Sequence, residues 1–221
     1  MPHLFQTTGQ LRSVEFQVSG VHCTKVSLGS MDNNSYLLDA GSSSPLLLID
    51  AAAEPRRLLE MLAGRPLGVV VSTHRHADHL QALAELIAQT GAVPFAGRED
   101  ANAIAQQTGI VSRRVWTGDW IDCGRVRLEV IGLVGHTPGS IALVLHGGDD
   151  GPTHIFSGDS LFPGGVGKTK SPADFSSLLD DVTRKVFDRF SDETVVHPGH
   201  GDSTTLGAER PQLPQWRTRG W

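Results

Sequence analysis

Hydrophobic and polar residues alternate along the first part of the chain. Residues 11–18 read LRSVEFQV, an alternation typical of a half-buried strand, and residues 21–28 continue in the same style. Two apolar runs at residues 36–38 and 46–49 predict further strands on either side of a turn rich in glycine, serine and proline. The chain is therefore expected to begin with a β-sheet.

Helical periodicity appears next, between apolar strands. Residues 68–72 form a continuous apolar run, as in a strand buried on both faces, and residues 78–90 carry apolar side chains at helical spacing. The remaining predicted elements are helices over 54–63, 98–108 and from Ser171 onward, and strands over 126–134, 140–146, 154–157 and 194–197. Mixed strands and helices without a long linker predict one α/β domain over residues 1–221, with helices on the sheet faces.

Composition excludes several classes of function. The 221 residues are 39% hydrophobic, enough for a substantial core, and the formal charge of −5 offers no general attraction for nucleic acid or anionic lipid. The two cysteines, Cys23 and Cys123, cannot form a disulfide framework and are expected to be packing residues. No signal peptide and no membrane-spanning run are recognisable. We expect a cytoplasmic protein that binds a small molecule and neither nucleic acid nor a membrane.

Four potential metal ligands lie together directly after the apolar strand. The segment Thr73–His79 reads THRHADH and contains His74, His76, Asp78 and His79. A turn from a strand into a helix can aim several side chains at one point, and imidazole and carboxylate groups suit zinc, iron or manganese. The alternative is a polar helix start, with Asp78 near the positive end of the helix dipole.

Three later segments place further ligand types just after predicted strands. His136 lies in the turn GHTPGS, Asp159 follows the strand that starts at His154, and His200 lies in the loop PGHG. Glycine and proline shape such turns and let the backbone pass close to a metal. His154 itself is expected at the surface or at a strand end. Together the three segments are expected to complete the metal site.

These four segments resemble those of the metallo-β-lactamase superfamily and, within it, of the glyoxalase II-like hydrolases. The resemblance extends over nearly the whole chain, to Gly201, and implies a four-layer αβ/βα sandwich, an α/β or α+β fold with a two-metal site at one sheet edge. It implies two zinc ions, with iron or manganese as alternatives. The implied ligands are His74, His76 and His136 for the first metal, Asp78, His79 and His200 for the second, and Asp159 as a bridge. Asp50 matches the family's aspartate beneath the site, and its implied role is to orient a ligand histidine.

The resemblance also implies a reaction. Two metals that share a water lower its pKa toward about 7, and the resulting hydroxide attacks a small acyl substrate such as a thioester. Asp78 would position this nucleophile and later pass a proton to the leaving group. Lys168, in a glycine-rich stretch that the family also has, is a candidate anchor for a substrate carboxylate. Trp216 and Trp221 either pin the tail or contact another subunit, so a homo-oligomer is one of two alternatives.

Two other activities share this ligand set. Persulfide dioxygenases resemble glyoxalase II but use one iron, held by the equivalents of His74, His136 and Asp159, and lactonases keep all seven ligands. Gly201 after His200 favours the hydrolase over the dioxygenase. Lys170 stands where the glyoxalase II-like family has a tyrosine, so recognition of glutathione does not follow from the resemblance. A metal-free scaffold is disfavoured because every ligand type is present.

Overall fold

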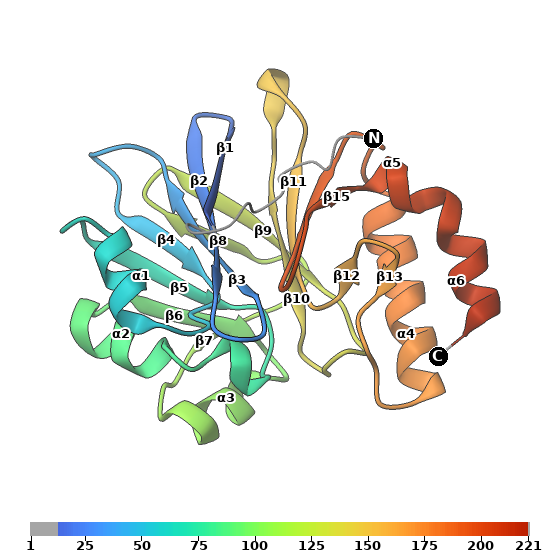
Figure 1. Cartoon of the computed structure of the whole chain (residues 1–221), viewed down its shortest axis with the longest axis horizontal. Coiled ribbons are helices and arrows are strands. Elements are labelled where there is room, and N and C mark those ends of the chain that lie inside the picture. Colours follow the sequence, from blue (N-terminus) through green and yellow to red (C-terminus); the bar gives the residue numbers. More distant parts are fainter. Residues whose placement is uncertain (1–12, 221) are drawn as a thin grey trace.

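Two β-sheets face each other at the centre of the molecule, and helices cover the outer face of each (Figure 1). The structure is a computed structural model that describes residues 13–220. Residues 11 and 12 of the first predicted strand and Trp221 lie outside the described residues. No helix within the described range has both the length and the apolar character that a membrane span requires.

The first sheet has seven strands in sequence order. These are β1 (Ser13–Val18), β2 (Val21–Leu28), β3 (Asn33–Asp39), β4 (Leu46–Ile49), β5 (Leu67–Ser72), β6 (Val93–Gly97) and β7 (Arg113–Val115). Strands β1 to β4 pair antiparallel, whereas β4 to β7 pair parallel. The carboxyl ends of β4, β5 and β6 therefore meet at one edge of the sheet.

The second sheet has six strands in the order β15-β14-β11-β10-β9-β8. They are β8 (Trp120–Cys123), β9 (Val126–Gly132), β10 (Ile141–Leu145), β11 (His154–Gly158), β14 (Val195–Pro198) and β15 (Thr204–Thr205). Strands β11 and β14 are parallel, so their carboxyl ends also share an edge. A small hairpin of β12 (Leu161–Phe162) and β13 (Gly165–Val166) follows β11 directly.

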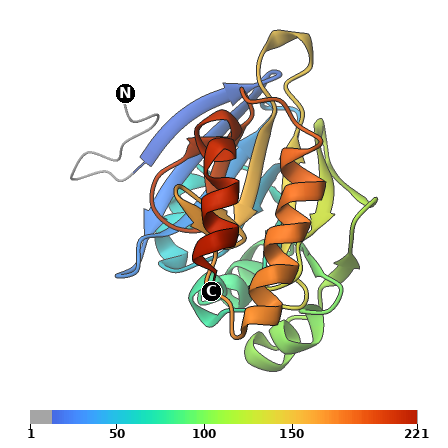
Figure 2. The same ribbon diagram turned by 90° about the vertical axis from the view of Figure 1, so that its right-hand side faces the viewer.

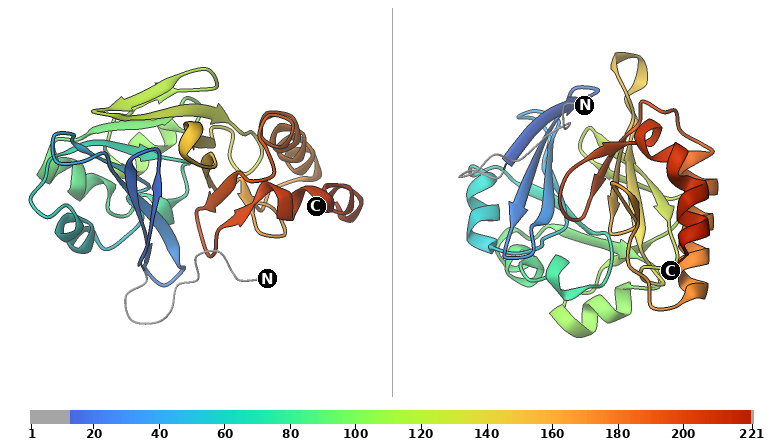
Figure 3. Two further views of the ribbon diagram at one scale, coloured as in Figure 1. Left: turned by 90° about the horizontal axis from the view of Figure 1, so that it is seen from above. Right: turned by 45° about the vertical axis from the view of Figure 1, so that its right-hand side comes forward.

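The helices form the two outer layers, and the views in Figures 2 and 3 show α4 and α6 side by side over the second sheet. The first sheet is covered by α1 (Pro55–Met61), α2 (Leu83–Thr90) and α3 (Ala101–Thr108), and the second by α4 (Pro172–Val182), α5 (Leu206–Glu209) and α6 (Leu213–Arg219). Three apolar clusters fill the spaces between the layers: one between the sheets and one under each helical layer. The predicted four-layer αβ/βα arrangement is confirmed.

Several local predictions need correction. The helix expected over residues 78–90 is interrupted: a single 3-10 turn spans Ala77–His79, and α2 begins only at Leu83. Strands β6, β7 and β8 were not predicted, because they are short and lack a clear alternation. Trp216 is buried against Phe187, which supports the tail-pinning alternative for that residue. Cys23 and Cys123 are free and buried, as expected for packing residues.

A buried pair of histidines lies between the sheets, where a surface or strand-end position was expected for His154. His154 does begin β11, but it is only 4% exposed, and its Nδ1 lies 2.8 Å from Nε2 of the fully buried His197. Phe16 stacks on both rings, and His197 Nδ1 is 2.8 Å from Ser203 Oγ. Burial lowers the pKa of His154 to about 4 and that of His197 well below its usual value.

Acid should therefore destabilise the fold partly through His154. Its folded-state pKa of about 4 lies below the ordinary histidine value of 6.5, so the unfolded chain takes up a proton first as the pH falls. The contribution is fully present above pH 6.5 and is lost as the pH falls toward 4. Between pH 6.5 and 5 we expect the wild-type chain to lose roughly 1–2 kcal/mol more unfolding free energy than His154→Gln, measured by urea denaturation. Parallel stability curves for the two chains would contradict this.

Candidate metal centre

The predicted site residues follow strand ends that meet between the two sheets. In the first sheet, Asp50 follows β4 and the segment 74–79 follows β5. In the second sheet, Asp159 follows β11 and His200 follows β14, while His136 lies in the turn between β9 and β10. An isolated bridge between Asn33 and His200 and a backbone hydrogen bond from Asn34 to Gly199 join the two sheets at this edge. Five separate segments thus converge on one place.

Asp50 orients the loop after β5 through hydrogen bonds. The backbone of Asp50 has a φ of 56°, and the two carboxylate oxygens accept hydrogen bonds from the Thr73 backbone N–H and hydroxyl at 2.7 and 2.8 Å. His79 Nδ1 donates to the same carboxylate at 3.0 Å. With its proton on Nδ1, the His79 ring presents the lone pair of Nε2 to the site. Asp50 is therefore committed to hydrogen bonds, and its geometry fits the orienting role that the resemblance implied.

Three more imidazole rings are anchored through Nδ1 in the same manner. His136 Nδ1 donates to the backbone carbonyl of Lys168 at 2.6 Å, and His200 Nδ1 donates to the carbonyl of Met31 at 2.9 Å. His74 Nδ1 lies 3.0 Å from Thr73 Oγ1, whose own proton goes to Asp50. Each bond directs the Nε2 atom of its ring toward the site, which is the arrangement of metal-binding histidines.

The carboxylates of Asp159 and Asp78 lie among these nitrogens. Asp159 Oδ2 is 3.6 Å from His136 Nε2 and 3.4 Å from His200 Nε2, while its Oδ1 is 3.5 Å from His79 Nε2. Asp78 Oδ2 lies 3.5 and 3.4 Å from the Nε2 atoms of His79 and His200. Asp159 therefore faces both halves of the site, whereas Asp78 faces one.

The donor atoms form three groups that could each hold a metal ion. The first contains His74, His76 and His136, and the second contains Asp78, His79 and His200. The third, Asp50 with His74 and His79, shares one histidine with each of the other two. Among the described residues, His74 Nε2, His136 Nε2 and Asp159 Oδ1 are buried polar atoms without a hydrogen-bond partner. Buried polar atoms are rarely left unpaired, so these three fit an ion that would satisfy them. The donor set, imidazole nitrogen with carboxylate oxygen, suits zinc, iron or manganese.

The protonation states suit metal binding as well. Burial lowers the pKa of both His74 and His76, which favours the neutral rings. Burial alone would raise the pKa of Asp159, but the hydrogen bond from His200 and the neighbouring imidazoles lower it below its usual range. Asp159 in turn raises the pKa of His200 to about 9. In the absence of a metal the His200–Asp159 pair is thus a charged one, and its proton would leave when a metal binds.

Glycines allow the loops to close around Asp159. A Cβ atom at Gly199 would lie 2.1 Å from Asp159 Oδ1, and one at Gly167 would lie 1.7 Å from the Asp159 carbonyl oxygen. Neither contact is sterically possible, so a side chain at either position would displace the carboxylate or the backbone that carries it. These two glycines have a packing function at the site in addition to shaping turns.

The hairpin between β2 and β3 supplies contacts that the sequence patterns did not reveal. Asn33 Nδ2 donates to Asp78 Oδ2 at 2.7 Å, and Asn34 Nδ2 donates to the carbonyls of Pro198 and Gly201 at 2.9 and 3.0 Å. Tyr36 donates its hydroxyl to the Pro198 carbonyl at 2.6 Å. The signal available in the sequence was the pair of asparagines at the start of a strand, whose side chains are buried.

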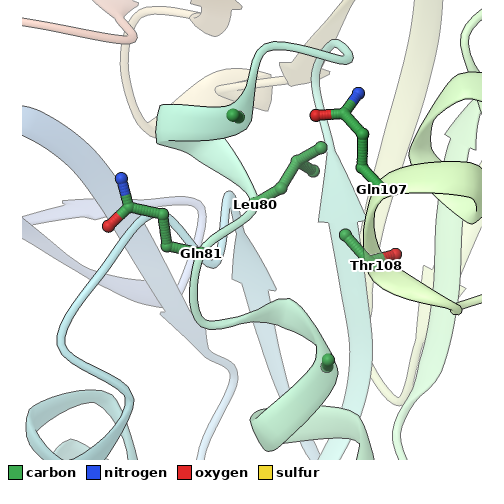
Figure 4. A pocket seen from close by; sticks show the side chains of 6 residues that line it. Leu80, Gln81, Gln107 and Thr108 are labelled. Atoms are coloured by element: carbon green, nitrogen blue, oxygen red, sulfur yellow. The ribbon is translucent and has the colours of Figure 1, made fainter.

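Two cavities flank the site without containing the proposed ligands. One of about 290 Å³ lies on the helix side of the loop after β5, between Leu80 and Gln81 on one wall and Gln107 and Thr108 of α3 on the other (Figure 4). The other, of about 410 Å³, is lined by residues 166–169, Phe175, Arg219 and Gly220. Lys168 belongs to this second cavity, and its carbonyl holds His136.

Comparison with known proteins identifies the family. Residues 28–203 match the family model described as the metallo-beta-lactamase superfamily. The chain belongs to the metallo-β-lactamase superfamily. Within that superfamily, it is 34% identical over 170 residues to a hydroxyacylglutathione hydrolase of Polaromonas sp. (strain JS666), a match that covers 76% of this chain and 62% of that protein.

Two further relatives cover more of their own length. Hydroxyacylglutathione hydrolase GloC of Haemophilus influenzae is 28% identical over 185 residues, which cover 76% of this chain and 85% of that protein. The crystal structure of TTHA1623 in a di-iron-bound form matches with a TM-score of 0.70 and 31% identity, and the match covers 87% of this chain and 99% of that one. The predictions of a metallo-β-lactamase fold and of a metal-dependent hydrolase of this superfamily are confirmed.

Removing a donor atom should remove metal. We expect Asp159→Ala or His136→Ala to lose metal retention and with it all activity, because each residue carries a buried atom that nothing else satisfies. Metal content per chain, measured by mass spectrometry after dialysis, checks this. His146→Ala is the matched control, since His146 pairs with Glu129 away from the site and should leave the metal content unchanged. Full turnover in a metal-depleted Asp159→Ala or His136→Ala chain would contradict the assignment.

Proposed function

We propose that this chain is a glyoxalase II-like hydrolase that binds two metal ions, zinc in the first instance, and cleaves a small acyl substrate such as a thioester. The observation that carries the proposal is the convergence of four Nδ1-anchored imidazoles and two carboxylates on one point. The relatives named hydroxyacylglutathione hydrolase support a thioester as the substrate class.

The proposed ligands divide into two sets around Asp159. His74, His76 and His136 would hold the first ion, and Asp78, His79 and His200 the second, with Asp159 shared between them. When bound, such ions polarise a carbonyl group and provide a water of lowered pKa. Asp50 and the backbone carbonyls of Met31 and Lys168 keep the rings in place throughout the reaction, since they hold the Nδ1 atoms.

Asp78 is the residue suited to proton transfer. Its side chain is 21% exposed, whereas that of Asp159 is 11% exposed, so Asp78 is the more accessible of the two carboxylates. Asn33 donates a hydrogen bond to Oδ2, which fixes the orientation of the carboxylate and leaves Oδ1 as an acceptor. Asp78 would align the attacking water and then return a proton to the departing thiolate or alkoxide.

Lys168 is the proposed anchor for the substrate. It is exposed at the cavity of about 410 Å³, which Arg219 also lines, while Val166 and Phe175 give the cavity apolar walls. Two cations beside apolar surface fit an acyl group or thiol that carries a carboxylate. The cavity adjoins the site through the hydrogen bond from His136 to the Lys168 carbonyl.

Metal content and substrate range test the proposal directly. We expect freshly purified protein to contain about two metal ions per chain, zinc foremost, and to hydrolyse thioesters within a panel that also includes lactones and simple esters. Chelation should abolish the activity and added metal should restore it. Selective lactone turnover would replace the thioester assignment with a lactonase. About one iron per chain, with oxygen consumption in the presence of a persulfide, would replace it with a dioxygenase.

The role of Lys168 is tested by kinetics. We expect Lys168→Ala to raise KM for an anionic thioester by roughly tenfold with little change in kcat, because the lost contact is made equally in the ground and transition states. A neutral thioester should show no such change. Lys170→Ala is the matched control, because Lys170 is an exposed lysine two residues away that does not line the cavity. Equal effects of both substitutions would exclude a specific anchor.

A further inference from the structure

Asp100 is a buried carboxylate outside the proposed ligand set. It follows β6 and occupies the N-cap position of α3, and its side chain is completely buried. An aspartate at an N-cap normally accepts hydrogen bonds from the first turn of its own helix. Here the side chain makes no such bond. Its oxygens are directed to two loops of the metal centre instead.

The contacts of Asp100 are complete and specific. Oδ2 accepts hydrogen bonds from the Arg75 backbone N–H at 3.0 Å and from the Thr137 hydroxyl at 2.5 Å. Oδ1 accepts one from the Gly139 backbone N–H at 3.1 Å and lies 3.6 Å from Arg75 Nε. A carboxylate out of water is costly unless it is paired and hydrogen-bonded, and both conditions are met here.

The partners of Asp100 are the immediate neighbours of three proposed ligands. Arg75 lies between His74 and His76, and Thr137 directly follows His136. The rings of His74 and His76 lie 4.9 and 4.6 Å from that of His136, measured between centroids. One carboxylate therefore joins the loop that carries two rings of the first metal site to the turn that carries the third.

The surrounding backbone is built for this close contact. A Cβ atom at Gly139 would lie 2.3 Å from the Asp100 backbone nitrogen, and one at Gly97 would lie 1.9 Å from the Gly139 carbonyl oxygen. From the other end of α3, Gln107 donates to the Arg75 carbonyl at 2.9 Å, and Figure 4 shows its side chain reaching from α3 toward the turn that carries Leu80. The backbone N–H of Arg75 is thus bound by Asp100 at the start of α3, and its backbone carbonyl is bound by Gln107 near the end of α3.

We propose that Asp100 is a positioning residue that sets the spacing of His74, His76 and His136 and so the affinity of the first metal site. The inference rests on the proposed metal centre but not on the substrate. Without the carboxylate, the Arg75 and Gly139 N–H groups and the Thr137 hydroxyl lose their shared acceptor, and the two loops are no longer joined. The rings would then no longer be held at one common point.

The test compares the zinc affinity of the wild-type chain with that of Asp100→Asn. The amide keeps the size of the carboxylate but replaces one of its oxygens with an NH₂ group. At least one of the three groups that donate to Asp100, which are two backbone N–H groups and a hydroxyl, then loses its acceptor. We expect one of the two zinc equivalents to bind about 10- to 100-fold more weakly in a chelator competition, and kcat to fall more than KM changes. Asp39→Asn is the matched control, since Asp39 accepts from the Gly41 N–H and pairs with Arg65 at the opposite end of β3.

Zinc affinity also separates positioning from simple stabilisation. If Asp100→Asn lowers the unfolding free energy of the metal-free protein but binds both zinc ions as tightly as the wild type, the proposal is overturned. If that variant does not fold, Thr137→Val decides together with Ser140→Ala, because Thr137→Val removes a donor to Asp100 and the contact with Ser140, whereas Ser140→Ala leaves the Asp100 contact in place. A zinc site weakened by Thr137→Val but not by Ser140→Ala supports the proposal, and any other result rejects it. A wild-type chain that binds no zinc, iron or manganese would overturn the metal centre itself.

Discussion

The direction of four imidazole rings depends on one kind of contact, a hydrogen bond from Nδ1 to an acceptor that the fold holds in place. The acceptors are the carboxylate of Asp50, the hydroxyl of Thr73 and the backbone carbonyls of Met31 and Lys168. Each bond determines the tautomer of its ring and turns Nε2 toward the centre. If these rings were free to rotate, their Nε2 atoms would no longer point to the one place at which the carboxylates and the glycine-containing loops meet.

The two sheets are needed together to bring these acceptors into place. Met31 lies in a hairpin of the first sheet but anchors His200, which follows the last parallel strand of the second sheet. Tyr36 and Asn34 bind the same loop from the first sheet through backbone carbonyls. The apolar cluster between the sheets fixes their separation, and the site therefore depends on the packing of the core as much as on its own residues.

Buried charge is tolerated at Asp50 and Asp100 because each of these carboxylates accepts several hydrogen bonds. Asp50 accepts from Thr73 and His79, and Asp100 accepts from Arg75, Thr137 and Gly139. Asp159 differs, since one of its oxygens has no hydrogen bond and its charge is balanced by imidazoles alone. Asp50 and Asp100 are therefore suited to holding loops in place, whereas Asp159 keeps an oxygen that is suited to binding a metal.

The local sequence by itself determined which residues are candidate metal ligands. Three histidines and an aspartate crowd into Thr73–His79 after a buried strand, and glycine-flanked histidines recur after later strands. These signals are short in range, so spacing alone reveals them. The helix predicted over 78–90 was wrong in its first part. Periodicity could not show that the residues between the turn ending at His79 and α2 donate backbone hydrogen bonds to Ala51 and Ala52, in the loop after β4.

Only the tertiary structure decided how these candidate ligands are held. Asn33, Asp100 and the Met31 carbonyl act on residues that are distant in the chain, and no local pattern marks such contacts. Asp100 shows the limit most clearly: in the sequence it is an unmarked position inside the helix predicted over 98–108, and in the fold it joins two loops of the proposed metal centre. Residue type and spacing determine which atoms can bind a metal, whereas their position in space follows from strand order and sheet packing.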